Sequence, residues 1–176
     1  MLHHTETGKK KIQGNWIVPL FLVLLILALF IPLRDALIIN DFRTGKTLKV
    51  LPVKEGESFS IRYTHSVNLS DVTDTLEWTD NKLVLRTSLF TSFGAGIPVP
   101  ADGIGTSITN TEDGFLLSGI DKEQKDNGLL VMLQEVPNHR LLYRDREIPL
   151  LDIAPSGTLL QLKIRNASLC ELALFD

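Results

Sequence analysis

Residues 62–74, with the sequence RYTHSVNLSDVTD, decide which fold the sequence predicts, because they join two strand-like segments. Successive side chains of a strand point to opposite faces of a sheet, so apolar residues at alternate positions mark an inward face. His65 and Asp74 interrupt the apolar faces of these two segments. Because a buried charge without a partner is costly, the two polar groups either pair with each other inside a core or face a pocket where a ligand binds or reacts.

A four-residue connection over residues 68–71 predicts how the two strands pair. It sets His65 opposite Asp74, and it sets apolar residues opposite one another, namely Val67 with Val72, Tyr63 with Leu76 and Ile61 with Trp78. Directly opposed side chains have Cβ atoms about 4.5–5.5 Å apart, which is close enough for a hydrogen bond between His65 and Asp74. A slip of one residue would turn the apolar face to solvent, so the pattern favours this register.

The next turn, at Asp80 and Asn81, predicts a second hairpin. It sets Asp74 opposite Thr87, and it pairs Trp78 with Leu83, Leu76 with Leu85 and Val72 with Leu89. The inner face of the sheet would then carry one polar row, formed by His65, Asp74 and Thr87. A bulge in either strand would break this alignment.

From residue 34 onward the chain consists of short strand-like segments separated by turn signals, with no convincing amphipathic helix longer than a few turns. The other turn signals lie at residues 43–46, 54–57, 113–114, 127–128, 137–138 and 156–157. The last strand, residues 158–165, alternates Leu160, Leu162 and Ile164 with polar side chains. About eight to ten short strands with one solvated face predict an all-β fold, either a β-sandwich or a squat barrel.

An uncharged apolar run of 18 residues, 16–33, is long enough for a helix that crosses the hydrocarbon core of a membrane. Lysines at 9–11 precede the run and only Arg34 follows closely, so the positive-inside rule predicts a cytoplasmic tail (1–15) and an extracytoplasmic β-domain (34–176). A cleaved signal peptide is the alternative, although the residues after Phe30 offer no small-x-small cleavage site. We therefore expect a single-pass protein of the cell membrane that keeps one N-terminal transmembrane helix.

Charge and cysteine content exclude several classes of protein. The β-domain holds 15 Lys and Arg against 20 Asp and Glu, a formal charge of −5, which argues against a nucleic-acid partner. Cys170 is the only cysteine, so neither an intramolecular disulfide nor a cysteine metal cluster can form. The domain must therefore be held together by its hydrophobic core.

Three other features of the sequence are only weak signals for a catalytic, metal-binding or anion-binding site. Ser66 adjoins His65, but adjacent strand residues point to opposite faces, and no G-x-S-x-G elbow occurs. The histidines are scattered, with His139 alone in a turn, so we expect neither a metal site nor a cofactor. Gly94 and Gly96 belong to a glycine-rich turn that either presents backbone N–H groups to an anion or simply ends a strand.

Three motifs together resemble a known family. They are Tyr63-Thr64-His65-Ser66-Val67, the acidic Asp74, and Phe93-Gly94-Ala95-Gly96-Ile97-Pro98. The family comprises small, typically membrane-anchored bacterial proteins of unknown function, whose genes tend to lie beside TAXI-type tripartite ATP-independent periplasmic (TRAP) transporters. The resemblance covers residues 38–165. The sequence departs from the family at Asp71, where the family tends to have proline, and at Asp74, where it tends to have glutamate.

The resemblance implies a membrane-tethered accessory or binding subunit of a TAXI-type TRAP system, with the permease or the solute receptor as partner. Candidate binding residues are Tyr63, His65, Ser66, Asp74, Thr87, Gly94 and Gly96. We expect no enzymatic activity. One alternative is a cell-envelope hydrolase that uses His65 and Asp74, for which Thr87 is the only nucleophile on the same predicted face. Another is a purely structural envelope module.

Overall fold

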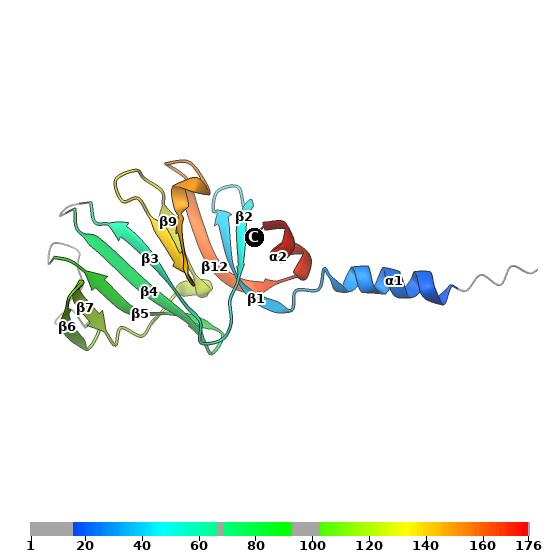
Figure 1. Cartoon of the computed structure of the whole chain (residues 1–176), viewed down its shortest axis with the longest axis horizontal. Coiled ribbons are helices and arrows are strands. Elements are labelled where there is room, and N and C mark those ends of the chain that lie inside the picture. The colour runs from blue at the N-terminus through cyan, green and yellow to red at the C-terminus, as the bar shows by residue number, and fades with distance from the viewer. Residues whose placement is uncertain (1–15, 67–68, 93–102, 176) are drawn as a thin grey trace, which may run out of the picture.

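Two antiparallel β-sheets that pack face to face make up most of the protein (Figure 1). The computed structural model describes residues 16–66, 69–92 and 103–175. In order across the four-stranded sheet, the strands are β2 (Thr47–Pro52), β1 (Arg34–Asp41), β12 (Leu159–Ala167) and β9 (Gly128–Met132). The eight-stranded sheet comprises β11 (Arg146–Pro149), β10 (Arg140–Tyr143), β3 (Ser58–Thr64), β4 (Asp71–Thr79), β5 (Lys82–Phe90), β7 (Gly114–Ser118) and β6 (Ser107–Thr111), with β8 (Lys122–Glu123) paired to β5.

The predicted β-sandwich is confirmed, whereas the squat barrel is wrong, because each sheet keeps its own edges. The described residues form twelve strands rather than eight to ten, and the short strands β8 and β11 account for the excess. Short 3-10 helices, η2 (Lys125–Asn127) and η3 (Leu150–Asp152), lie between strands. The fold is therefore mostly β, not purely β.

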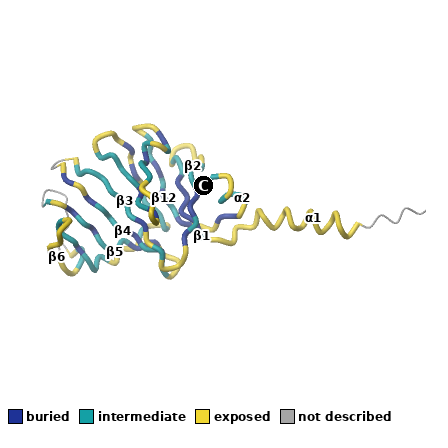
Figure 2. Tube along the Cα trace, in the orientation of Figure 1, coloured by how far each residue is buried: buried dark blue, intermediate teal, exposed yellow. Residues whose placement is uncertain are grey.

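The main core fills the space between the two sheets. The four-stranded sheet contributes Leu37, Ile39, Leu51, Leu160 and Leu162, and the eight-stranded sheet contributes Phe59, Ile61, Leu76, Trp78 and Leu83. Figure 2 shows this buried layer in the strands of both sheets. Burial of each large apolar side chain stabilises the fold by about 1.5–3 kcal/mol. Side-chain hydrogen bonds also join the sheets, since Trp78 Nε1 donates to Asp35 Oδ2 at 3.0 Å and the hydroxyl of Tyr143 donates to Pro52 O.

A short C-terminal helix, α2 (Leu169–Phe175), covers the outer face of the four-stranded sheet. Its side chains Leu172 and Phe175 pack on a cluster formed by Ala36, Ile38, Val50 and Ala167. The helix begins with a capping box, since Ser168 Oγ accepts from the Glu171 N–H at 3.1 Å and Glu171 Oε2 accepts from the Ser168 N–H at 3.0 Å. The sequence prediction missed this helix, although Ser168 and Glu171 have the spacing of that motif.

The N-terminal helix α1 (Ile17–Ala28) extends away from the sandwich, and none of its residues is buried (Figures 1 and 2). The carbonyl oxygen of Leu29, just after α1, accepts a hydrogen bond from the N–H of Cys170 at 3.1 Å. Among the described residues, none of the helices combines the length and the apolar content needed to span a membrane.

The register between β3 and β4 differs from the predicted one by four residues. Asp74 lies opposite Ile61, and Tyr63 lies opposite Val72. The predicted pairing of His65 with Asp74 is therefore wrong. β3 ends at Thr64, and His65 belongs to the connection, where its N–H donates to Ser70 O at 2.7 Å. Because the shift is an even number of residues, the inward faces of both strands are those that the sequence predicted.

The register between β4 and β5 is partly as predicted. Trp78 lies opposite Leu83 and Leu76 opposite Leu85, but the register shifts between Thr75 and Leu76. Beyond this irregularity Asp74 lies opposite Ser88, Val72 opposite Phe90, and Thr87 opposite Thr75. Thr87 consequently lies on the face away from Asp74, since neighbouring strand residues point to opposite faces. The predicted polar row of His65, Asp74 and Thr87 is wrong.

Candidate functional site

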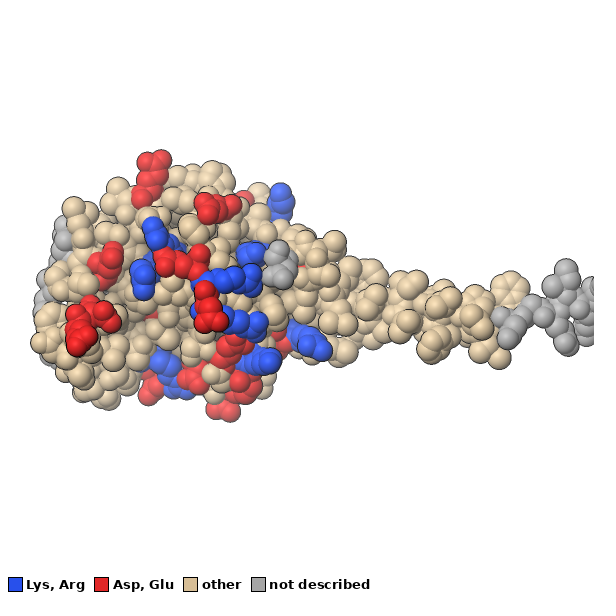
Figure 3. Space-filling view, in the orientation of Figure 1, with Lys and Arg blue, Asp and Glu red and all other residues tan. Residues whose placement is uncertain are grey.

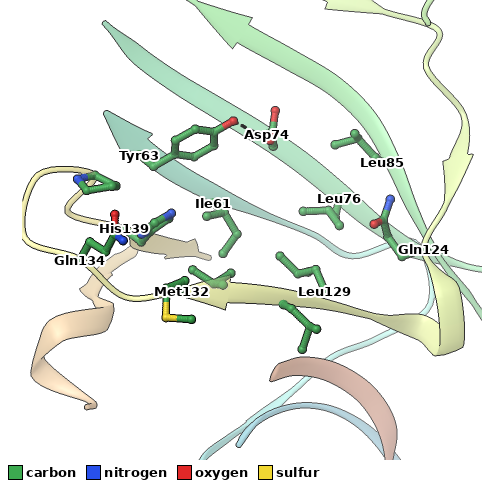
Figure 4. A pocket seen from close by; sticks show the side chains of 13 residues that line it. Ile61, Tyr63, Asp74, Leu76, Leu85, Gln124, Leu129, Met132, Gln134 and His139 are labelled. Atoms are coloured by element: carbon green, nitrogen blue, oxygen red, sulfur yellow. Dashed lines mark hydrogen bonds between the residues drawn. The ribbon is translucent and has the colours of Figure 1, made fainter. Parts of the chain in front are cut away.

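A pocket of about 380 Å³ lies between the inner face of the eight-stranded sheet and strand β9 of the other sheet (Figure 4). Most of its wall is apolar and comprises Ile61, Leu76, Leu85, Leu129, Leu130, Val131, Met132 and Pro137. Its polar lining comprises Tyr63, Asp74, Gln124, Gln134 and His139. The residues therefore come from β3, β4 and β5 on one side, and from β9 and the segments flanking it on the other.

The pocket arises where the four-stranded sheet ends. β9 is the last strand of that sheet, whereas the eight-stranded sheet continues from β4 through β5 to β7 and β6. The inner face of this continuation carries a second apolar cluster, built on Val72, Phe90 and Leu117. Tyr63 packs against both this cluster and the main core, so its ring marks the boundary at which the pocket opens.

Asp74 is the one carboxyl group among the described residues that line this pocket. Its Oδ1 atom accepts a hydrogen bond from Ser88 Oγ at 2.7 Å, and its Oδ2 atom lies 3.5 Å from the hydroxyl of Tyr63, at the limit of a hydrogen bond. Burial raises the pKa of Asp74 above its ordinary value, and the two hydroxyl donors only partly offset this effect. The pKa of Tyr63 is raised as well, first by burial and then by the neighbouring carboxylate.

His139 forms the wall next to Tyr63. The two rings stack with their centroids 5.5 Å apart and their planes inclined by 30°. Burial lowers the pKa of His139, so the imidazole is neutral near pH 7. Its Nδ1 atom is buried and has no hydrogen-bond partner in the described part of the chain. Backbone hydrogen bonds from Leu150 N to His139 O and from Thr64 N to Pro137 O hold this segment against the end of β3 and the residue that follows β11.

Of the predicted binding residues that the structure describes, two line the pocket together, Tyr63 and Asp74. Ser66 is exposed in the connection after β3. Neither His65 nor Thr87 lines the pocket. Gly94 and Gly96 lie outside the described residues.

Sequence reasoning missed Ser88, His139, Gln124 and Gln134. A register shift between Thr75 and Leu76, which no residue of the sequence signals, places Ser88 instead of Thr87 opposite Asp74. His139 is 76 positions from Tyr63 in the chain and reaches it because β10 pairs with β3. No local pattern in the sequence predicts a contact between residues so far apart in the chain.

The arrangement is suited to binding. In the hydrolase alternative His65 is the base and Asp74 orients it. The observed register does not bring these two residues together. What the pocket offers is an apolar chamber with one carboxyl group, one phenol and one neutral imidazole at its wall. No lysine or arginine is present among the described lining residues.

The fold and the pocket thus define a mostly β protein, a sandwich with a small chamber between its sheets. Residues 59–150 match the family described as the domain of unknown function DUF1850, and the chain belongs to this family. The matched region runs from β3 to the end of β11 and includes every lining residue of the pocket. No curated protein and no solved structure matches the chain.

Proposed function

We propose that this protein is an extracytoplasmic binding subunit, tethered to the cell membrane by its N-terminal apolar segment, that serves a TAXI-type TRAP solute transport system. The observation that carries the binding role is the pocket between the sheets. Small-molecule sites have volumes of about 300–1,000 Å³ and combine apolar walls with a few polar groups, and this pocket has both properties.

The tether is supported by the sequence of residues 16–33, which carry no charge, and by the three lysines that precede them. Figure 3 shows the same contrast in space, because the charged side chains seen there lie over the β-domain and none lies on α1. The transport context is supported by the motifs around Tyr63 and Gly94 that resemble the transporter-associated family. Tethering suits this role, since it keeps the domain at the surface where permease and solute receptor meet.

The experiment combines co-purification with a blocked pocket. The full chain is cross-linked in cells, extracted from the membrane in detergent, and its partners are identified, with a TRAP permease or solute receptor expected. Uptake of that transporter's solute is then measured in cells carrying Leu85→Trp, which fills the pocket, or Leu174→Trp, which places the same side chain on the exposed face of α2.

We expect Leu85→Trp to lower uptake and Leu174→Trp to leave it unchanged. Undiminished uptake with a correctly folded Leu85→Trp protein would mean that the pocket has no role and would favour a structural envelope module. Failure to recover any transporter subunit would remove the TRAP context.

A further inference from the structure

The charge inside the pocket is one-sided. Asp74 contributes a carboxyl group, and the other polar lining residues, Tyr63, Gln124, Gln134 and a neutral His139, contribute no positive charge. Arg62 lies next to Tyr63 in β3 and therefore points to the other face of the sheet, where its side chain contacts Thr73 and Glu147. Arg140 likewise pairs with Glu147, at 2.6 Å. Both arginines thus have partners outside the pocket.

The described residues occupy only part of the hydrogen-bonding capacity of the Asp74 carboxylate. An ionised carboxylate has about four acceptor positions, and Asp74 receives one short hydrogen bond, from Ser88, and one long one, from Tyr63. A buried carboxylate is stable when a cation or several donors surround it. Among the described residues the donors to this carboxylate are the two hydroxyls, so a ligand could supply further ones.

The hydroxyl oxygen of Tyr63 adds a second acceptor for a cation. This hydroxyl lies against Asp74 (Figure 4). A phenolic hydroxyl that donates its proton to a carboxylate can still accept a hydrogen bond through its oxygen. A positively charged group beside Asp74 would therefore meet a carboxylate and a hydroxyl oxygen together.

We propose that the ligand of this pocket is a small organic amine, with an apolar body that fills the chamber and a protonated amino group that pairs with Asp74 beside Tyr63. This inference rests on the proposed binding function and names its ligand class. Acidic solutes are the opposite case, because their carboxylate would lie near Asp74 with no lysine or arginine in the described lining to receive it.

The test uses three probes that share one apolar ring and differ in charge: cyclohexylmethylamine, cyclohexylmethanol and cyclohexanecarboxylate. Each is titrated at pH 7.5 into the full chain in lipid nanodiscs, by calorimetry and by the NMR shifts of the Asp74 and Leu129 amides. We expect the amine to bind at least about tenfold more tightly than the alcohol, about 1.4 kcal/mol, and the carboxylate to bind most weakly. Asp74→Asn should abolish the preference for the amine, whereas Asp71→Asn, on an exposed residue of the same strand, should preserve it.

The outcomes separate this inference from the function on which it rests. Alcohol binding as tight as amine binding, or an amine preference that survives Asp74→Asn, would overturn the ligand class while leaving the pocket a binding site. Absence of binding by all three probes to the folded chain would overturn both. Should Asp74→Asn fail to fold, the order of the three affinities in the unmodified chain still decides, since tighter binding of the carboxylate contradicts the proposal.

Discussion

Ser88 Oγ donates a hydrogen bond to Asp74 Oδ1 at 2.7 Å across the β4–β5 pair, and this contact fixes the carboxyl group at the pocket wall. Ser88 is buried and the Asp74 side chain is partly buried, so water cannot fully replace the bond if it is lost. Hydrogen bonds to charged groups contribute about 1.5–3 kcal/mol. The contact therefore links the geometry of the site to the stability of the fold.

Replacing Ser88 by alanine should lower the free energy of unfolding by about 1.5–3 kcal/mol at pH 7, measured by urea denaturation. Thr87→Ala is the matched control, because Thr87 lies on the opposite face of the same strand, and it should cost less than about 1 kcal/mol. Equal losses in the two variants would show that the hydrogen bond to Asp74 contributes nothing of its own.

A second prediction concerns one of the hydrogen bonds between the sheets, from Trp78 Nε1 to Asp35 Oδ2. Asp35→Ala leaves the N–H of a buried indole without its acceptor, which should cost about 1–3 kcal/mol. In the Trp78→Phe background the same change should cost much less, because the donor is already gone. The four proteins form a double-mutant cycle, and a coupling energy near zero would show that water replaces Asp35 as the acceptor.

The strands' inward faces could be predicted from the sequence, whereas their pairing could not. Alternation at Ile61, Tyr63, Val72 and Leu76 determines which face is buried, and a slip by any even number of residues leaves that face unchanged. The length of the connection after Thr64 then decides the register, and it exceeds the four residues expected. His65 therefore lies in a loop instead of beside Asp74.

Only some of the residues that line the pocket could be predicted from the sequence, for a related reason. Asp74 stands out because it is a polar interruption of an apolar stripe, which a sequence displays directly, and Tyr63 belongs to the predicted inward face of the preceding strand. His139 contributes to the site through the pairing of β10 with β3, and β9 contributes its edge because its sheet ends there. These contacts depend on the order of strands across the sheets, and neither periodicity nor turn signals encode that order.

The N-terminal segment gives a third prediction. Protease added to intact cells whose wall has been removed should digest the β-domain and leave a small fragment, which includes residues 16–33, in the membrane. The expectation follows from the uncharged run and the lysines at 9–11, which together favour an uncleaved anchor with a cytoplasmic tail. Recovery of a soluble protein that begins after residue 30 would show instead that the segment is a cleaved signal.

A fourth prediction follows from the raised pKa of Asp74, which burial places above the ordinary value of 3.8. Between the unfolded and folded pKa values the folded state binds more protons, so the stability contributed by this group falls as the pH rises through that window. Relative to Asp74→Asn, which cannot titrate, the unmodified protein should therefore gain stability as the pH is lowered from 7 toward 3.8. Urea denaturation of both proteins measures the difference, and an NMR titration that placed the carboxyl pKa at or below 3.8 would contradict it.

The pKa of His139 predicts the opposite dependence on pH. Burial lowers this pKa below the ordinary 6.5, so the folded state binds fewer protons than the unfolded chain just below pH 6.5. The stability contributed by His139 is complete above pH 6.5 and is lost as the pH falls through the folded pKa. His139→Gln removes the titrating group. The free energy of unfolding of the unmodified protein should exceed that of this variant by less at pH 5 than at pH 7.5. Loss of the stacking on Tyr63 also lowers the stability of the variant, but equally at every pH. A difference in unfolding free energy that does not vary with pH would show that the imidazole is hydrated in the folded protein, and the wall of the pocket would then be open to water at this point.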